Sequence, residues 1–144
     1  LDLDCESGSF CYRSECKPDP SNQGLAAWNN MLSALRRADR STYVNSFAPT
    51  YECYFSRRNH PRSAMMESRD GYFSSSRSSN SYRNRNVRAR ALSPTRVLIT
   101  QEILLSGTWY DTAAIVERRN GRWVVVVEAD ETSHGCFPVS GVFR

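Results

Sequence analysis

Two strongly apolar stretches flank the dipeptide Asn120-Gly121, and no other feature of the sequence constrains the fold as much. An Asn-Gly pair favours the tight turn of a two-residue β-hairpin, so residues 108–119 and 122–130 are expected to pair as antiparallel strands. With Arg119 opposite Arg122, a regular register gives these pairs: Val116 with Val125, Ile115 with Val126 and Ala114 with Val127. Consecutive pairs point to opposite faces, so both faces of this hairpin are apolar.

A sheet that is apolar on both faces needs a cover on each of them. Helices from the same chain can cover one face. A second copy of the same sheet is the simplest cover for the other, which predicts a homodimer through the sheet.

The rest of the chain supplies helices first and strands later. Helical spacing of apolar residues begins at Gly24 and ends near Arg37, and a second short helix is expected between Asp39 and Pro49. A strand follows at 50–55, and a third helix is expected after Pro61. Residues 74–86 are polar and predict a loop, and strands resume at Val87. We therefore expect an α+β chain with an antiparallel sheet, in which residues 1–23 form a cysteine-containing tail and residues 24–144 one domain.

The five cysteines indicate a disulfide framework. Their spacing shows no CxxC pair, and His60 and His134 are not spaced for zinc, so no metal site and no cofactor are expected. Cys53 alternates with aromatic residues in the strand-like run and suits a buried free thiol. The disulfide candidates are then Cys5, Cys11, Cys16 and Cys136, although two bridges among five cysteines leave many pairings open.

Disulfides are typical of an oxidising compartment, so the interpretation is a secreted, extracellular protein. The first residue is Leu1 rather than Met, which fits a removed signal peptide. The sequence has no run of about twenty apolar residues, so no membrane span is expected.

Two longer stretches resemble the NTF2-like superfamily, also called SnoaL-like or cystatin-like. The segment "AWNNMLSALRRADRSTYVNSFAPTYECYF" is similar to its opening helix, turn, short helix and first strand, and "ILLSGTWYDTAAIVERRNGRWVVVVEAD" is similar to its closing strands. The resemblance covers about residues 24–130. It implies a strongly curved sheet wrapped around an N-terminal helix with two shorter helices, a cone-shaped cavity, and dimers through the sheet.

The functions of that superfamily range from isomerases and dehydratases to assembly domains, so the fold does not specify a reaction. If the cone were an active site, a polar residue with a shifted pKa would lie in it, and the weak catalytic candidates are Asp111 and Tyr51. The candidates for lining a ligand pocket are Trp28, Tyr43, Tyr51 and Trp109. Core packing is the favoured role for both tryptophans.

Arginine dominates the basic residues and is concentrated in the middle of the chain. Between residues 57 and 96 there are ten arginines and only two acidic residues, Glu67 and Asp70. Arginine binds sulfate and phosphate well, so a polyanion site is expected at Arg83, Arg85, Arg88 and Arg90. In an extracellular protein the partner would be a sulfated glycan or an acidic protein rather than nucleic acid. The simpler interpretation is a solvated run of charge.

The sequence therefore favours a secreted, dimeric, non-catalytic binding or assembly module. Two alternatives stay open: a small isomerase- or dehydratase-like enzyme that uses a polar residue in an apolar cone, and a basic extracellular protein that binds sulfated glycans or other polyanions.

Overall fold

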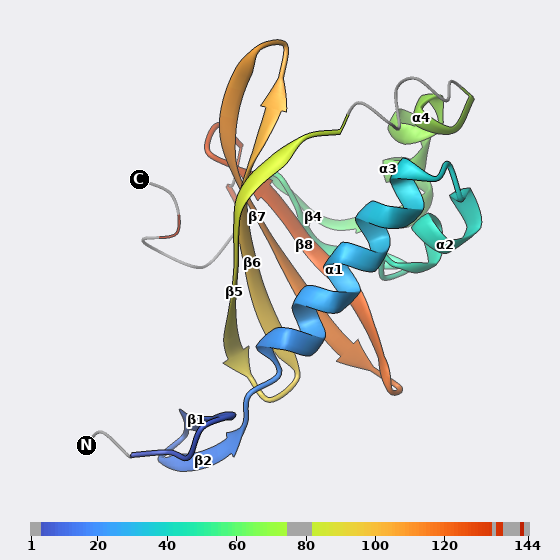
Figure 1. Cartoon of the computed structure of the whole chain (residues 1–144). Helices are drawn as coiled ribbons and strands as arrows, with labels where there is room; N and C mark the ends of the chain where they lie inside the picture. The colour runs from blue at the N-terminus through green and yellow to red at the C-terminus, as the bar shows by residue number, and fades with distance from the viewer. Residues whose placement is uncertain (1–3, 75–81, 134, 137–141, 143–144) are drawn as a thin grey trace.

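The computed structural model describes residues 4–74, 82–133, 135–136 and 142. It has a large curved sheet with helix α1 (Ser21–Arg36) lying across its concave side (Figure 1). The short helices α2 (Arg40–Asn45), α3 (Arg62–Arg69) and α4 (Gly71–Ser74) gather near one end of α1. The expected α+β architecture is confirmed, and the sheet stays open rather than closing into a barrel. The helix expected after Pro61 is divided into α3 and α4.

Six strands form the main sheet in the order β4-β3-β8-β7-β6-β5. Their bounds are β3 Thr50–Tyr54, β4 Arg57–Pro61, β5 Asn84–Ser93, β6 Arg96–Leu105, β7 Thr108–Arg119 and β8 Arg122–Asp130. All neighbours are antiparallel except β3 and β8, which run parallel. Strand β5 begins three residues earlier than predicted. Of the rest of the expected loop, Ser74 belongs to α4, and residues 75–81 lie outside the described residues.

The Asn120-Gly121 turn forms as predicted, and both residues have a positive φ. Arg119 faces Arg122 and Val116 faces Val125, but a β-bulge follows between Ile115 and Val116. The predicted pairs beyond that point are therefore wrong, because Val126 is the extra residue of the bulge. Ile115 faces Val127 instead, and Ala114 faces Glu128. This shift of one residue turns Glu128 toward the face that packs on α1.

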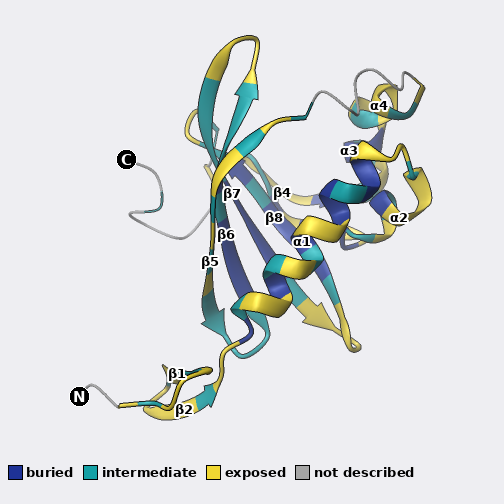
Figure 2. Cartoon of the chain, in the orientation of Figure 1, coloured by how far each residue is buried: buried dark blue, intermediate teal, exposed yellow. Residues whose placement is uncertain are grey.

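The main core lies between α1 and the concave face of the sheet, where the buried residues concentrate (Figure 2). Its largest contributions come from one face of α1, from the aromatic residues around α2 and β3, and from alternate residues of the long strands. The buried members include Trp28, Met31, Leu35, Phe47, Tyr51, Met65, Val97, Ile99 and Val125. The helical spacing in the sequence had predicted this apolar face of α1.

Close packing of α1 on β6 leads to a testable pair of substitutions. A Cβ added to Gly24 would lie 2.7 Å from Cβ of Val97, a distance at which one of the two elements must move. We expect Gly24→Ala to lower the free energy of unfolding by about 1–3 kcal/mol, measured by urea denaturation. Gly71→Ala in α4 is the matched control, because nothing lies within 4 Å of its added Cβ. It should be neutral or stabilising by up to about 1 kcal/mol, and equal losses in the two variants would contradict the packing argument.

The convex face of the sheet is also buried, but the chain itself covers much of it. Val124 and Val126 are 9% and 0% exposed in the single chain. They pack in a second cluster with Leu98, Ile115 and Cys136, and Val142 contacts this cluster. The sequence-based reason for a dimer is therefore wrong, because Cys136 and Val142, which follow β8, pack on this face without a second copy. The dimer itself stays a prediction.

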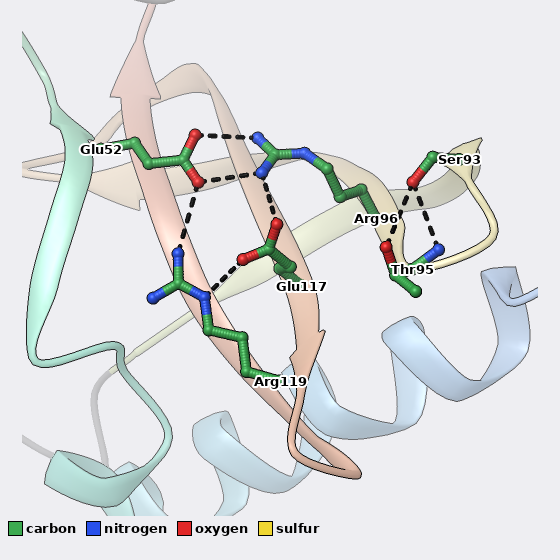
Figure 3. A network of polar contacts seen from close by, with 6 residues as sticks. All are labelled: Glu52, Ser93, Thr95, Arg96, Glu117 and Arg119. Atoms are coloured by element: carbon green, nitrogen blue, oxygen red, sulfur yellow. Dashed lines mark hydrogen bonds and ion pairs between the residues drawn. The ribbon is translucent and has the colours of Figure 1, made fainter.

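An ion-pair network borders the same convex face (Figure 3). Arg96 contacts Glu52 at 2.9 Å and Glu117 at 2.8 Å, and Arg119 contacts both carboxylates as well. Residues directly opposite in neighbouring strands share a face, and Glu117 lies opposite both Arg96 and Val124. The network thus places charged groups beside the apolar cluster.

Two disulfides are present, Cys5–Cys16 and Cys53–Cys136. The expectation that Cys53 is a free thiol is wrong: it is buried in the second cluster, where Cys136 reaches it from beyond β8. The expectation that Cys11 forms a disulfide is also wrong, since this residue is a free and exposed thiol. It lies opposite Cys16 in the hairpin of β1 (Ser9–Tyr12) and β2 (Glu15–Pro18), and Cys16 is already bonded to Cys5.

The N-terminal hairpin thus carries a cross-link of its own rather than a bridge to the body. It projects from the end of α1, away from the main sheet (Figure 1). Among the described residues, no helix has both the length and the apolar composition needed to cross a membrane.

Candidate functional site

A cavity of about 380 Å³ opens between α1 and the concave face of the sheet. One wall comes from α1, and the opposite wall comes from β6, β7 and β8. The apolar lining includes Trp28, Met31, Leu32, Leu35, Phe55, Ile103 and Leu105. The polar lining includes Tyr43, Tyr54, Arg69, Tyr82, Gln101, Thr112, Glu128 and Asp130. We call this cavity the cone.

An ion pair between Arg69 and Glu128 forms the polar centre of the cone. Nη1 of Arg69 lies 3.1 Å from Oε2 of Glu128, and Nη2 lies 3.2 Å from Oε1. The two side chains are only 14% and 13% exposed. Burial by itself lowers the pKa of Arg69, but Glu128 and the surrounding tyrosines outweigh it and raise the pKa well above its usual range. Arg69 therefore stays charged, and Glu128 is the acidic partner that compensates it.

Three tyrosines complete the hydrogen bonding of this pair. Arg69 donates to the hydroxyl of Tyr43 at 3.0 Å and to that of Tyr54 at 3.3 Å. Tyr51 donates its own hydroxyl hydrogen to Oε2 of Glu128 at 2.6 Å. Burial raises the pKa of Tyr43 and of Tyr51, and the Glu128 carboxylate raises both further. These phenols therefore stay protonated at physiological pH.

A second polar group is centred on Gln101, which is 4% exposed on β6. Its Oε1 accepts from the Trp28 indole at 3.3 Å and from the Asn84 amide at 2.9 Å. Its Nε2 donates to the hydroxyl of Tyr82 at 2.8 Å. Burial raises the pKa of Tyr82 to about 12. Gln101 thereby connects Trp28 of α1, Asn84 of β5 and Tyr82 to the floor of the cone.

The cone reaches the surface at Tyr72 and Leu105. These two are the only large apolar side chains that are exposed among the described residues, at 41% and 52%. Both border the cone, Tyr72 from α4 and Leu105 from the end of β6. An exposed apolar rim is typical of the entrance to a binding site.

The candidates for lining the pocket are placed differently from one another. Trp28 and Tyr43 line the cone. Tyr51 is fully buried behind it and contacts it through Glu128. Trp109 lies outside the cone, with the Arg85 guanidinium 3.9 Å from its ring centroid. Whether any of these residues contacts a ligand stays a prediction.

Asp111 lies on the face of the sheet opposite the cone. It pairs with Glu102, and two residues further along the two strands Thr100 pairs with Ala113 of the convex cluster. Side chains two residues apart share a face, so Thr112 rather than Asp111 faces the cone. Asp111 borders another polar cavity of about 420 Å³ with Asn86, Arg88 and Glu102, and this cavity shares Gln101 and Thr112 with the cone. Asp111 is therefore not among the residues that line the cone, and a catalytic role for it stays a prediction.

The four arginines expected to bind polyanions lie at or near the edge strand β5. Arg85 is paired with Glu102 at 3.2 Å and stacked on Trp109, so its charge is already engaged. Arg88 and Arg90 are exposed, and Arg83 contacts the carbonyl of Tyr82 at 3.2 Å. Polyanion binding at this edge stays a prediction.

Sequence reasoning missed Arg69, Glu128 and Gln101. Arg69 is one of many arginines, and nothing in its neighbourhood marks it as buried. A regular strand from Val125 would have placed Glu128 on the convex face, and only the bulge turns it inward. Gln101 lies between Thr100 and Glu102 in β6, so no sequence signal indicated that this polar residue faces the core.

Solved structures with the same arrangement identify the fold. An NTF2-like protein of unknown function from Shewanella oneidensis has a TM-score of 0.62 and 12% identity, covering 77% of this chain and 98% of its own. The fold is NTF2-like. The resemblance predicted from the sequence is thereby confirmed at the level of structure. No protein-family model and no curated protein sequence matches this chain.

Other proteins with the NTF2-like fold have different roles. The association domain of Caenorhabditis elegans CaMKII has a TM-score of 0.53 and 15% identity, covering 76% of this chain and 90% of its own. A proposed polyketide cyclase from Xanthomonas campestris has a TM-score of 0.51 and 16% identity, with the same coverage. At these identities the likeness shows the fold alone, so function has to be argued from the cone itself.

Proposed function

We propose that the protein is a non-catalytic binding module that takes a small, largely apolar molecule into the cone. The carrying observation is that Tyr72 and Leu105, the exposed large apolar residues of the described chain, both border this cavity. Its volume of about 380 Å³ is in the range of small-molecule sites. The apolar wall supplies the affinity, and the few polar groups at its centre supply orientation.

The hydrogen bonding of Glu128 supports binding over a reaction. A general base has to reach a proton of the substrate. Both oxygens of this carboxylate already accept hydrogen bonds, from Arg69 and from Tyr51. The partners are themselves buried, so Glu128 has a structural role in the cone and is poorly placed to accept a substrate proton.

Binding can be tested with the apolar fluorescent probe 2-isopropenylnaphthalene and with a substitution at the rim of the cone. We expect the probe to bind the wild-type chain, and Leu105→Ala to weaken binding about 3- to 10-fold, because the probe loses apolar contact. Leu105 is half-exposed, so this variant should fold normally. Naphthalene fluorescence measures the affinity.

Leu92→Ala is the matched control for this experiment. Leu92 packs against the cluster on the convex face, away from the cone. Its substitution should leave probe affinity unchanged. The proposed function is wrong if the wild-type chain does not bind the probe, or if the Leu92 and Leu105 variants weaken binding equally.

We also propose that the protein is secreted and self-associates. The two disulfides support an oxidising compartment. Support for self-association comes from the CaMKII association domain, which has the same fold. The apolar convex face gives no further support, because residues after β8 pack on it. Light scattering at micromolar concentration gives the solution mass directly.

A further inference from the structure

The tyrosine hydroxyls in the cone have forced hydrogen-bonding directions. A guanidinium can only donate hydrogen bonds. The hydroxyl oxygens of Tyr43 and Tyr54 must therefore act as acceptors toward Arg69, at 3.0 and 3.3 Å. Each of these hydroxyls keeps its own hydrogen for another partner.

The same reasoning fixes the direction at Tyr82. The Trp28 indole can only donate, so the atom of Gln101 that faces it must be the carbonyl oxygen. The amide nitrogen of Gln101 then faces Tyr82 and donates to its hydroxyl at 2.8 Å. Tyr82 is thus also an acceptor within the protein, and its hydroxyl hydrogen is left over.

No protein acceptor takes these three hydrogens within the described part of the chain. The contacts of the Tyr43, Tyr54 and Tyr82 hydroxyls are those to Arg69 and Gln101 alone. All three side chains line the cone. Tyr51 differs, because its hydrogen is already donated to Glu128 and its side chain lies behind the cone. The cone therefore presents several hydrogen-bond donors among apolar walls.

The cone presents no uncompensated charge at its centre. Arg69 and Glu128 neutralise each other through two contacts, at 3.1 and 3.2 Å. Asp130 also lines the cone, and its Oδ1 already accepts three hydrogen bonds from Thr132 and Ser133. A charged ligand group at the centre would therefore be desolvated without a free counter-ion beside it, which is costly. A neutral group with an acceptor oxygen would instead satisfy the spare hydroxyl hydrogens.

From this arrangement we infer that the ligand is a neutral, largely apolar molecule with an acceptor oxygen, such as a ketone, an ester or an ether, held by the hydroxyls of Tyr43, Tyr54 and Tyr82. This inference rests on the proposed function, since it specifies the chemistry of the molecule that enters the cone. The apolar body contacts the α1 side and the rim, and the oxygen lies toward the tyrosines.

Four probes with one naphthyl body test the inference on the wild-type chain. They are 2-acetylnaphthalene, its hydrocarbon isostere 2-isopropenylnaphthalene, the anion 2-naphthoate and the cation 1-(2-naphthyl)ethylammonium. We expect the ketone to bind about 3- to 10-fold more tightly than the hydrocarbon, as one or two net hydrogen bonds would give. Both charged probes should bind more weakly than the ketone.

Tyrosine variants then locate the hydrogen bonds. In Tyr43→Phe, Tyr54→Phe and Tyr82→Phe the ratio of ketone to hydrocarbon affinity should fall toward 1 in at least one case. Tyr51→Phe is the matched control and should keep the wild-type ratio, because its hydroxyl donates to Glu128. The ratio cancels any general damage to the cone, and the comparison of probes on the wild-type chain does not depend on any variant folding.

The outcomes separate this inference from the proposed function. Equal affinity for ketone and hydrocarbon, tighter binding of either charged probe, or a wild-type ratio in all three cone variants overturns the inference while the apolar cone remains a binding site. Failure of the hydrocarbon probe to bind the wild-type chain overturns the proposed function itself.

Discussion

Replacing Arg69 with methionine is expected to lower the free energy of unfolding by about 3–5 kcal/mol, because it leaves the Glu128 carboxylate buried without its counter-ion. The two side chains are 14% and 13% exposed, so water can replace little of the lost interaction. Urea denaturation followed by tryptophan fluorescence measures the change.

Two further variants make this result specific. Arg40→Met removes an ion pair with Asp70 whose side chains are 53% and 51% exposed, and it should lower the free energy of unfolding far less than Arg69→Met does. Combining Arg69→Met with Glu128→Gln removes the uncompensated charge and should recover more than about 1 kcal/mol. Similar losses for Arg69→Met and Arg40→Met would show that the buried pair has no special role.

Removing the Cys53–Cys136 disulfide by substituting both residues with alanine is expected to cost about 4.5 kcal/mol. The bridge closes a loop with a sequence separation of 83. In the chain-entropy model, a loop of this length lowers the conformational entropy of the unfolded chain and so stabilises the folded state by about that free energy. The bridge also joins β3 to the residues that cover the convex face. The midpoint of urea denaturation should fall accordingly.

The Cys5–Cys16 disulfide is the matched control. Its sequence separation is only 11, and both residues belong to the N-terminal hairpin, which is separate from the main sheet. Alanine at both positions should change the unfolding of the main domain by less than about 1 kcal/mol. If this pair mattered as much as Cys53–Cys136, the hairpin would have to be an integral part of the folded body.

The features of the fold that follow local rules could be predicted from the sequence. The apolar spacing on α1 and the Asn120-Gly121 turn gave the main helix and the central hairpin, because helix periodicity and turn geometry depend on neighbouring residues. The position of β4 was missed, since Arg57–Pro61 has almost no apolar alternation.

The polar centre of the cone could not be predicted in the same way. Arg69 and Glu128 are 59 residues apart in the sequence, and their pairing depends on where α3 lies against the sheet. The bulge at Ile115 and Val116 decides which way Glu128 points, and a run of four valines gives no sign of its position. The Cys53–Cys136 pairing likewise depends on a long-range feature, because the residues after β8 have to pack against the convex face near β3. Local sequence patterns do not predict such a contact.

The bridge between Cys53 and Cys136 has a consequence for a protein exposed to proteases. A single backbone cleavage anywhere between these two cysteines, a span that includes β4, α3 and the four long strands, would leave both fragments covalently joined. The nicked protein would keep its full mass until a reductant separated the fragments. Over most of its length, therefore, a broken backbone would not by itself divide the molecule.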